Sequence, residues 1–274
     1  MEALWLTYYS NIFNPARVKI HAMEAEMPKK YWRNLPETAV IPAVLEQAPR
    51  RVENMLKKSG QQKATQDGEF PPAPVPDSKD LGKVEAASKR CRACPLYLRG
   101  TQTVFGEGPK RAPMMLIGEQ PGDQEDLAGK PFVGPAGKIM NRALEEAGID
   151  RTQVYVTNAV KHFKWEPRGK RRIHKKPNSR EIAACRPWLE AELNLVRPKL
   201  VVCLGATAAQ TIFGPAFRVT RDRGKVLTSD FAPKVIATVH PSSLLRQPDE
   251  ESREREYKGF VADLKVALKA AGAK

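Results

Sequence analysis

The sequence of 274 residues lacks any long apolar run, and none approaches the length of about 18 residues that crosses a bilayer. Its first residues, MEALWLTYYSNIF, also lack the order of basic, apolar and small residues that marks a signal peptide. We therefore expect a cytosolic protein with no membrane association. Only four cysteines are present, and in a reducing compartment we do not expect them to pair as disulfides.

Acidic residues are scarce relative to basic ones. The sequence holds 31 Asp and Glu against 46 Lys and Arg, which gives a net charge of +15. Such an excess favours a polyanionic partner, and nucleic acid is a better candidate than a membrane surface.

Composition divides the chain into three parts. Residues 1–58 are rich in aromatic side chains and predict a small, partial helical segment that is short for an independent core. Residues 59–80, SGQQKATQDGEFPPAPVPDSKD, are polar and rich in proline, which predicts a flexible linker. The remaining residues, 81–274, are expected to form the main domain.

Four apolar runs in the main domain alternate with helical patterns. The runs lie near residues 114–119, 154–158, 200–205 and 235–240. This alternation predicts an α/β fold: a three-layer, doubly wound, mostly parallel four-stranded sheet with helices on both faces. A dinucleotide-binding fold is less favoured, because Gly118 and Gly122 lack the GxGxxG spacing.

Polar or backbone-exposing residues follow each of these predicted strands. They are Glu119, Asn158, the Gly205-Ala206-Thr207 turn and His240. In open α/β sheets, ligands bind where the carboxyl ends of the strands meet such loops. A lone histidine is more often structural than catalytic, so both interpretations of His240 stay open here. Four such ends on one rim are nevertheless hard to attribute to packing.

The cysteines suggest a metal site. Cys91 and Cys94 form a CxxC, and Cys185 and Cys203 follow on a predicted helix and strand. A four-thiolate site for zinc or an iron–sulfur cluster is one interpretation. The other is a set of small buried hydrophobic residues. The spacing favours a metal site and leaves the metal undecided.

A basic run, RGKRRIHKK, occupies residues 168–176 with six basic residues in nine and no acid. Such runs usually form solvated loops. This one follows the Asn158 strand closely enough to fold back over the rim and contact phosphates. The surrounding cations should disfavour the charged form of His174 and leave a neutral nucleophile or base.

Five segments, taken together and in order, resemble the iron–sulfur branch of the uracil-DNA glycosylase superfamily. They are GEQPG (118–122), PFVGPAGK (131–138), VTNAVKHF (156–163), KRRIHK (170–175) and VHPSSLLR (239–246). Gln120 and the KRRIH segment are similar to the X-type members of that branch. The resemblance covers residues 81 to about 270. The N-terminal segment resembles part of an uncharacterised domain found upstream of such enzymes.

The resemblance implies a site and a cofactor. Cys91, Cys94, Cys185 and Cys203 would hold a [4Fe–4S] cluster that shapes the DNA-binding surface. Uracil would leave the base stack for a pocket. His240 would donate to the charge that develops on uracil, and Glu119 would stabilise the sugar cation or orient the attacking group. Substrate contacts are expected from Gln120, Gly122, Asp123, Phe132, Asn158 and Arg172, and DNA-backbone contacts from Lys170, Arg171, Lys175, Ser242 and Ser243.

The X-type pattern further implies that His174 takes the place of water, so that DNA becomes covalently attached to the protein. The expected partner is uracil-containing DNA, single-stranded in preference, and the protein is expected to be a monomer. Two alternatives remain. One is a conventional glycosylase that turns over, and the other is a non-enzymatic DNA-binding protein that senses damage or redox state.

Overall fold

The computed structural model describes residues 69–169 and 171–272, within a unit that begins at Phe70. The predicted helical segment 1–58, the start of the predicted linker and Lys170 lie outside the described residues. Among the helices that the structure describes, none is both long and apolar enough to span a membrane.

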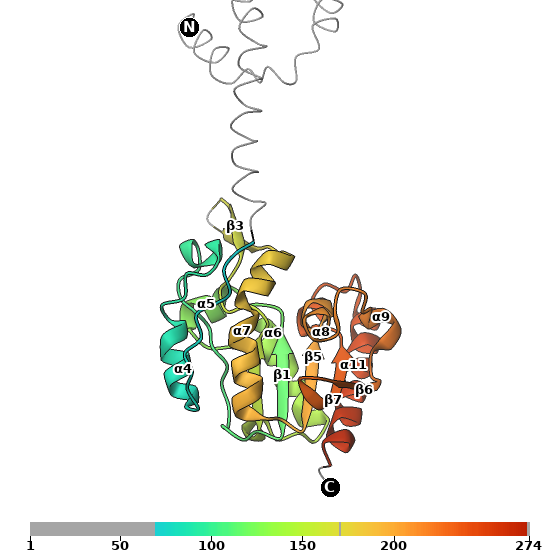
Figure 1. Cartoon of the computed structure of the whole chain (residues 1–274). Helices are drawn as coiled ribbons and strands as arrows, with labels where there is room; N and C mark the ends of the chain where they lie inside the picture. The colour runs from blue at the N-terminus through green and yellow to red at the C-terminus, as the bar shows by residue number, and fades with distance from the viewer. Residues whose placement is uncertain (1–68, 170, 273–274) are drawn as a thin grey trace, which may run out of the picture. The chain divides into compact units, whose positions relative to one another are not determined.

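A five-stranded sheet forms the centre of this unit (Figure 1). Its order is β2 (Val154–Asn158), β1 (Met114–Gly118), β5 (Leu200–Leu204), β7 (Ala232–Thr238) and β6 (Val226–Ser229). The first four strands are parallel, which confirms the prediction from the apolar runs. The sequence analysis missed β6, which pairs antiparallel with β7 at the edge. Its exposed and half-buried positions alternate, so it contains no apolar run that would reveal it.

Helices cover both faces of the sheet (Figure 1). One face packs against α6 (Pro135–Glu146) and α11 (Glu250–Ala271), and the other against α7 (Ser179–Val196), α8 (Ala206–Phe213) and α9 (Val219–Asp222). Every residue of β1, β2 and β5 is buried, as the apolar runs require when helices lie on both sides. Shorter elements connect these layers: α4 (Leu81–Ser88), η4 (Pro95–Leu98), α5 (Asp123–Ala128), η5 (Arg151–Gln153) and α10 (Pro241–Leu244).

The start of α7 is fixed by a capping box. The Glu181 backbone N–H donates to Asn178 Oδ1 at 2.9 Å, and the Asn178 backbone N–H donates to Glu181 Oε2 at 2.7 Å. The predicted pairing of these two residues is therefore confirmed.

The end of the predicted linker belongs to the folded unit. Phe70, Ala73 and Val75 pack with the cluster of side chains that includes Cys91 and Cys185. The Ala73 N–H also donates to the carbonyl of Ala184 on α7 at 2.9 Å. Proline-rich composition suggested flexibility for this stretch, but its apolar side chains find a surface to cover.

The basic run forms a hairpin. β3 (Trp165–Arg168) and β4 (Arg171–His174) pair antiparallel with each other and belong to a separate two-stranded sheet. Trp165 lies directly opposite His174 in this register. The hairpin thus places His174 at the end of a strand, beside the segment that leaves β2.

Candidate active site

The polar strand ends meet at one rim, as expected for parallel strands. A pocket of about 860 Å³ lies there and is lined by Glu119, Asn158, His240 and His174 among others. Phe132, Gln120, Gly122, Asp123, Ser242 and Ser243 line the same pocket. The structure therefore brings together most of the residues that the sequence assigned to uracil and the reacting sugar.

Close packing around Gly118 sets the floor of this pocket. A Cβ atom at this position would lie 2.3 Å from Asn158 Oδ1 and 2.7 Å from Phe132 Cζ, which no real side chain tolerates. Phe132 itself has a φ of 56°, an uncommon backbone conformation for an aromatic residue. Its ring lies 6.2 Å from the His240 ring, with an interplanar angle of 29°. A flat base can therefore be bounded by an aromatic face here.

Asn158 is 2% exposed, and its side-chain amide hydrogen-bonds to no described residue. Its backbone is held by a buried ion pair. Lys161 Nζ donates to the Asn158 carbonyl at 2.8 Å and to Glu192 Oε2 at 2.5 Å, and both charged side chains are fully buried. Thr157 Oγ1 also donates to Glu192. The amide of Asn158 is thus rigidly placed and available to a ligand.

His240 is held in the tautomer that donates into the pocket. Its Nδ1 accepts the Ser242 backbone N–H at 3.2 Å and lies 2.8 Å from Ser242 Oγ. A ring nitrogen that accepts carries no proton in the neutral imidazole, so the proton is on Nε2. Burial, followed by the charges of Arg246 and His174, lowers the pKa of His240 to about 4. His240 is therefore a neutral hydrogen-bond donor near pH 7.

Glu119 lies between Thr207 and His174. The Thr207 hydroxyl donates to Glu119 Oε2 in a short hydrogen bond. The other carboxylate oxygen lies 3.5 Å from His174 Nε2. Thr207 thus fixes the carboxylate from α8, and the free oxygen faces the imidazole.

The pKa of His174 is lowered, mainly by partial burial. Arg246 lowers it further, whereas Glu119 raises it. The sequence predicted a neutral imidazole but attributed it to the basic run. The cation that lowers the pKa of His174 is instead Arg246, which follows α10, and the sequence analysis did not single it out.

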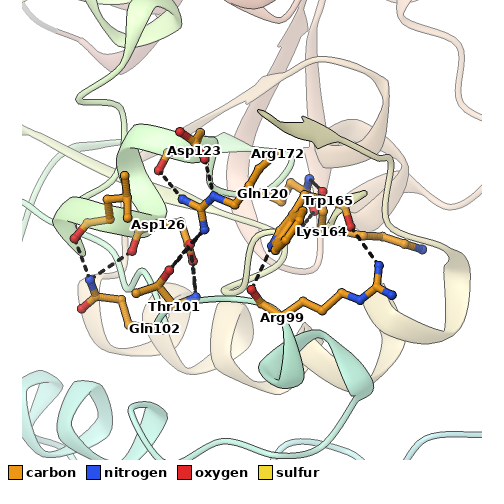
Figure 2. Close-up of polar contacts among 10 residues, drawn as sticks. Arg99, Thr101, Gln102, Gln120, Asp123, Asp126, Lys164, Trp165 and Arg172 are labelled. Atoms are coloured by element: carbon orange, nitrogen blue, oxygen red, sulfur yellow. Dashed lines mark hydrogen bonds and ion pairs between the residues drawn. The ribbon is translucent and has the colours of Figure 1, made fainter. Parts of the chain in front are cut away.

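Gln120 serves the hairpin. Its amide nitrogen donates to the carbonyls of Lys164 and Lys175 at 3.2 and 3.1 Å, and its oxygen accepts the Lys164 N–H at 3.1 Å. These bonds use the side-chain amide to pin the two ends of the hairpin, and Figure 2 shows Gln120 beside Lys164. A substrate contact from this residue would therefore come from its backbone.

Arg172 also holds the hairpin, a role that differs from the substrate contact expected of it. Its guanidinium pairs with Asp123 at 2.5 Å and with Asp126 at 2.6 Å, and it donates to Thr101 Oγ1 at 3.2 Å (Figure 2). Asp126 is fully buried, and the Thr101 N–H and hydroxyl satisfy it further. The guanidinium is committed to these partners rather than to the pocket.

The residues assigned to the DNA backbone divide into two groups. Arg171 and Lys175 lie exposed on or beside β4, and Lys175 pairs with Glu166 at 3.0 Å. Ser242 and Ser243 line the pocket, and their hydroxyls contact His240. The two serines therefore support the histidine in addition to any phosphate contact.

Three of the four cysteines lie in one buried cluster, and each sulfur accepts an N–H. Trp188 Nε1 donates to Cys91 at 3.2 Å, the Lys161 backbone N–H donates to Cys185 at 3.2 Å, and the Leu96 backbone donates to Cys94. Burial raises the pKa of the Cys185 thiol to about 12. Such donors are typical of thiolates that hold an iron–sulfur cluster.

Cys203 is separate from these three. It lies in the centre of β5, between Ile117 and Ala237, and packs in the side-chain cluster between the sheet, α7 and α8. Burial alone raises its pKa, with no contribution from another sulfur. The alternation of side chains along β5 points Cys203 into this apolar layer, which argues against its assignment as a ligand.

His162 lies beside the segment that follows Cys94. Its side chain is buried and lies against Gly100, six residues after Cys94. Burial lowers the pKa of His162 to about 4, so the ring is neutral and able to bind a metal. The sequence analysis did not single it out, because one histidine inside a mixed segment has no diagnostic spacing.

Within the described residues, no three His, Cys, Asp or Glu side chains lie close enough to hold a single metal ion. The ligands of a four-iron cluster each bind a different iron, so they are spaced more widely than those of one ion. The spacing of Cys91, Cys94 and Cys185 within one buried cluster of side chains therefore fits a four-iron cluster better than a single metal ion.

Comparison with known proteins agrees with this fold and site. The family described as the uracil DNA glycosylase superfamily matches residues 105–265, and a domain of unknown function, DUF4130, matches residues 1–37. A type-4 uracil-DNA glycosylase of Thermotoga maritima is 40% identical over 60% of this chain and 83% of its own length. Type-4 enzymes of Sulfurisphaera tokodaii and Archaeoglobus fulgidus are 36% and 37% identical, over 62% and 61% of this chain and 77% and 85% of their own.

A doubly wound sheet with an amide, a carboxylate and a histidine on one rim defines an α/β protein with a polar pocket at the carboxyl ends of its strands. The family match covers more than half of the chain. The chain belongs to the uracil-DNA glycosylase superfamily.

Proposed function

We propose that this protein excises uracil from DNA and becomes covalently attached to the sugar through His174. Membership of the superfamily supports the first part. One observation above all supports the second: His174 Nε2 lies 3.5 Å from Glu119 Oε1, in the same pocket as Asn158 and His240.

Recognition begins when uracil leaves the base stack and enters the pocket. Phe132 provides an aromatic face, and the free amide of Asn158 pairs with the Watson–Crick edge of the base. Single-stranded DNA is the preferred substrate in this proposal, because no base pair has to be broken before the base enters.

The bond between uracil N1 and sugar C1′ then breaks, and its electron pair leaves with uracil. The Nε2–H of His240 donates to the charge that develops on uracil O2, which is a stabilisation of the oxyanion-hole kind. The carboxylate of Glu119 stabilises the positive charge that develops on the sugar. Both groups come from the rim.

Capture of the sugar cation completes the reaction. A lone pair on His174 Nε2 forms a bond to C1′, and the imidazole then loses its Nδ1 proton to solvent. Uracil takes up a proton, so the products are uracil and a protein–DNA adduct. The lowered pKa of His174 supports this step, because the neutral ring is the nucleophile.

A conventional glycosylase that turns over is the second candidate, and similarity to the type-4 enzymes favours it. In that case water attacks C1′, and the hairpin contributes only charge. A denaturing gel and a uracil-release assay on the same samples decide between the two candidates.

With a uracil-containing oligonucleotide, the wild type should give one adduct that survives boiling in detergent, and product should never exceed protein. His174→Ser should form no adduct and should release uracil over several turnovers, because water reaches the cation. Turnover by the wild type without an adduct would establish the conventional enzyme. Absence of uracil release would favour a DNA-binding sensor.

A [4Fe–4S] cluster is the cofactor in this proposal. Cys91, Cys94 and Cys185 would hold it, and His162 replaces Cys203 as the fourth ligand. When bound, the cluster organises the DNA-binding surface; the cleavage itself needs neither oxidant nor reductant.

Iron content and visible absorbance of anaerobically purified protein test the ligand set. Cys185→Ala should lose most of its iron and its colour, whereas the matched Cys203→Ala should keep both. His162→Cys should retain a cluster with an altered spectrum. Loss of iron from Cys203→Ala with full retention in His162→Ala would restore Cys203 as the ligand.

A further inference from the structure

The hairpin that carries His174 is not part of the central sheet. β3 and β4 pair only with each other, and most of their residues are exposed. A two-stranded ribbon has little stability of its own, so its position must come from contacts with neighbouring segments. Gln120 and Arg172 provide two of these contacts.

A third contact lies at Trp165, directly across the hairpin from His174. The Trp165 indole donates from Nε1 to the Arg99 carbonyl at 2.8 Å. Arg99 Nη1 returns a longer bond of 3.4 Å to the Trp165 carbonyl (Figure 2). The Trp165 ring also lies 5.6 Å from the Arg172 guanidinium carbon, so it contacts both strands of the hairpin and a separate segment.

That separate segment begins at the cysteines. η4 starts immediately after Cys94, and Arg99 is its C-terminal cap. The bonds between Trp165 and Arg99 therefore connect the hairpin to the part of the chain that packs with Cys91 and Cys185.

We propose that Trp165 is a positioning residue for the covalent step. Its bond to Arg99 fixes β3 at the point where β3 pairs with His174, and so holds His174 in place. This position determines which share of the sugar cation reacts with His174 and which share reacts with water. This inference rests on the proposed covalent function. The groups that release uracil lie on the rim and are held by the sheet, so Trp165 should not affect departure of the base.

The physical reason is distance. Attack on a short-lived cation requires the nucleophile to be in place when the cation forms, and a small displacement of a reacting group reduces the rate strongly. If the bond of Trp165 is lost, the contacts of Gln120 and Arg172 still hold the hairpin, and it remains folded. His174 would then spend less time at C1′, and water would take a larger share.

Trp165→Phe is the sharpest test, because it removes the N–H donor and keeps an aromatic ring beside Arg172. Adduct and hydrolysed abasic product are quantified on one denaturing gel, and free uracil is measured in the same samples. We expect the adduct-to-hydrolysis ratio to fall about fivefold, the size expected for loss of one good hydrogen bond. The rate of uracil release should stay within about twofold.

Two further variants serve as controls. Arg99→Ala removes the longer bond but keeps the carbonyl that accepts from Trp165, so its effect on the ratio should be smaller. Tyr257→Phe removes a hydroxyl that contacts Arg142 and Glu146, away from the pocket, and should leave the ratio unchanged. Hydrogen exchange of residues 165–174 should accelerate in Trp165→Phe and not in Tyr257→Phe.

An unchanged ratio in Trp165→Phe, with the wild type forming adduct, overturns the positioning role and leaves the proposed function intact. Equal falls in uracil release and adduct also overturn it, because they indicate general damage to the site. If the wild type forms no adduct at all, the covalent function fails first and the role of Trp165 in it fails as a consequence.

Discussion

Asn158 and His174 face the same pocket but are held by different kinds of structure. Asn158 ends a buried strand, β2, at one edge of the sheet and is 2% exposed. The His174 side chain is 48% exposed and ends a two-stranded hairpin. A buried ion pair of Lys161 and Glu192 fixes the backbone of the first, whereas side-chain contacts at the surface fix the second.

The difference separates two parts of the proposed reaction. The rim residues belong to the sheet, whose position the hydrophobic core determines. The hairpin depends on a few polar contacts from Gln120, Arg172 and Trp165. Changes at the rim should therefore affect excision and capture together, whereas loss of the contacts that hold the hairpin in place should affect capture alone.

His240→Ala should have the largest effect on excision. It removes the neutral N–H donor that faces the pocket, and loss of one such donor commonly reduces the rate about 100- to 1000-fold. Adduct and free uracil should fall in parallel, since both follow the same first step. A single-turnover assay measures both products. Loss of adduct with normal uracil release would contradict the assignment of His240 to the excision step.

Asn158→Ala should reduce excision about tenfold or more, because the base loses the amide that is proposed to pair with its Watson–Crick edge. Binding to uracil-free DNA should be nearly unchanged. Asn194→Ala, on the exposed face of α7, is the matched control and should behave as the wild type. An equal loss of affinity for uracil-free DNA in Asn158→Ala would contradict its assignment to the base.

The rim could be predicted from the sequence because parallel strands bring their carboxyl ends to one edge. Buried apolar runs locate those strands, and the next polar residues follow at once. This reasoning placed Glu119, Asn158 and His240 together, and the structure lines one pocket with all three. The sequence analysis missed the edge strand β6, because a half-exposed strand has no such apolar run.

The hairpin and the cysteine site were harder to predict, because side-chain partners distant in the sequence determine them. Nothing in the order of residues shows that Arg172 pairs with Asp126, or that Trp165 bonds to Arg99. Four cysteines suggested one four-cysteine site, but the direction of a side chain on β5 places Cys203 in another layer. Counting candidate ligands does not reveal which of them face each other.

Arg171→Gln should change the salt dependence of DNA binding rather than the chemistry. Each phosphate contact that is lost should reduce the slope of log affinity against log salt by about 0.9, and weaken binding about threefold at low salt. Lys199→Gln is a suitable control, because Lys199 is exposed just before β5, at the opposite end of the sheet from the rim. An unchanged slope in Arg171→Gln would remove the hairpin cations from the DNA contact.

A change of pH should have the smallest of the predicted effects, and it should act on the capture of the sugar by His174. Protonation of His174 removes the lone pair that attacks C1′, so the adduct-to-uracil ratio should fall as pH drops through the pKa of His174. An ordinary imidazole, with a pKa of about 6.5, would lose half of its neutral form at that pH. Because burial and Arg246 lower the pKa of His174, the ratio at pH 6.5 should be reduced less than about twofold from its value at pH 7.5.

Excision should be still less sensitive in this range, since the pKa of His240 is about 4. Arg246→Gln provides the perturbation that sharpens the test. Removing this cation should raise the pKa of His174 and move the fall in the ratio to higher pH, because one of the two causes of the lowered pKa is gone. Adduct and uracil measured together at pH 5.5, 6.5 and 7.5, conditions chosen at about one-unit steps around the ordinary imidazole value, give the profile. A ratio that is already halved above pH 6.5 in the wild type would show that the hairpin holds His174 in water rather than in the pocket.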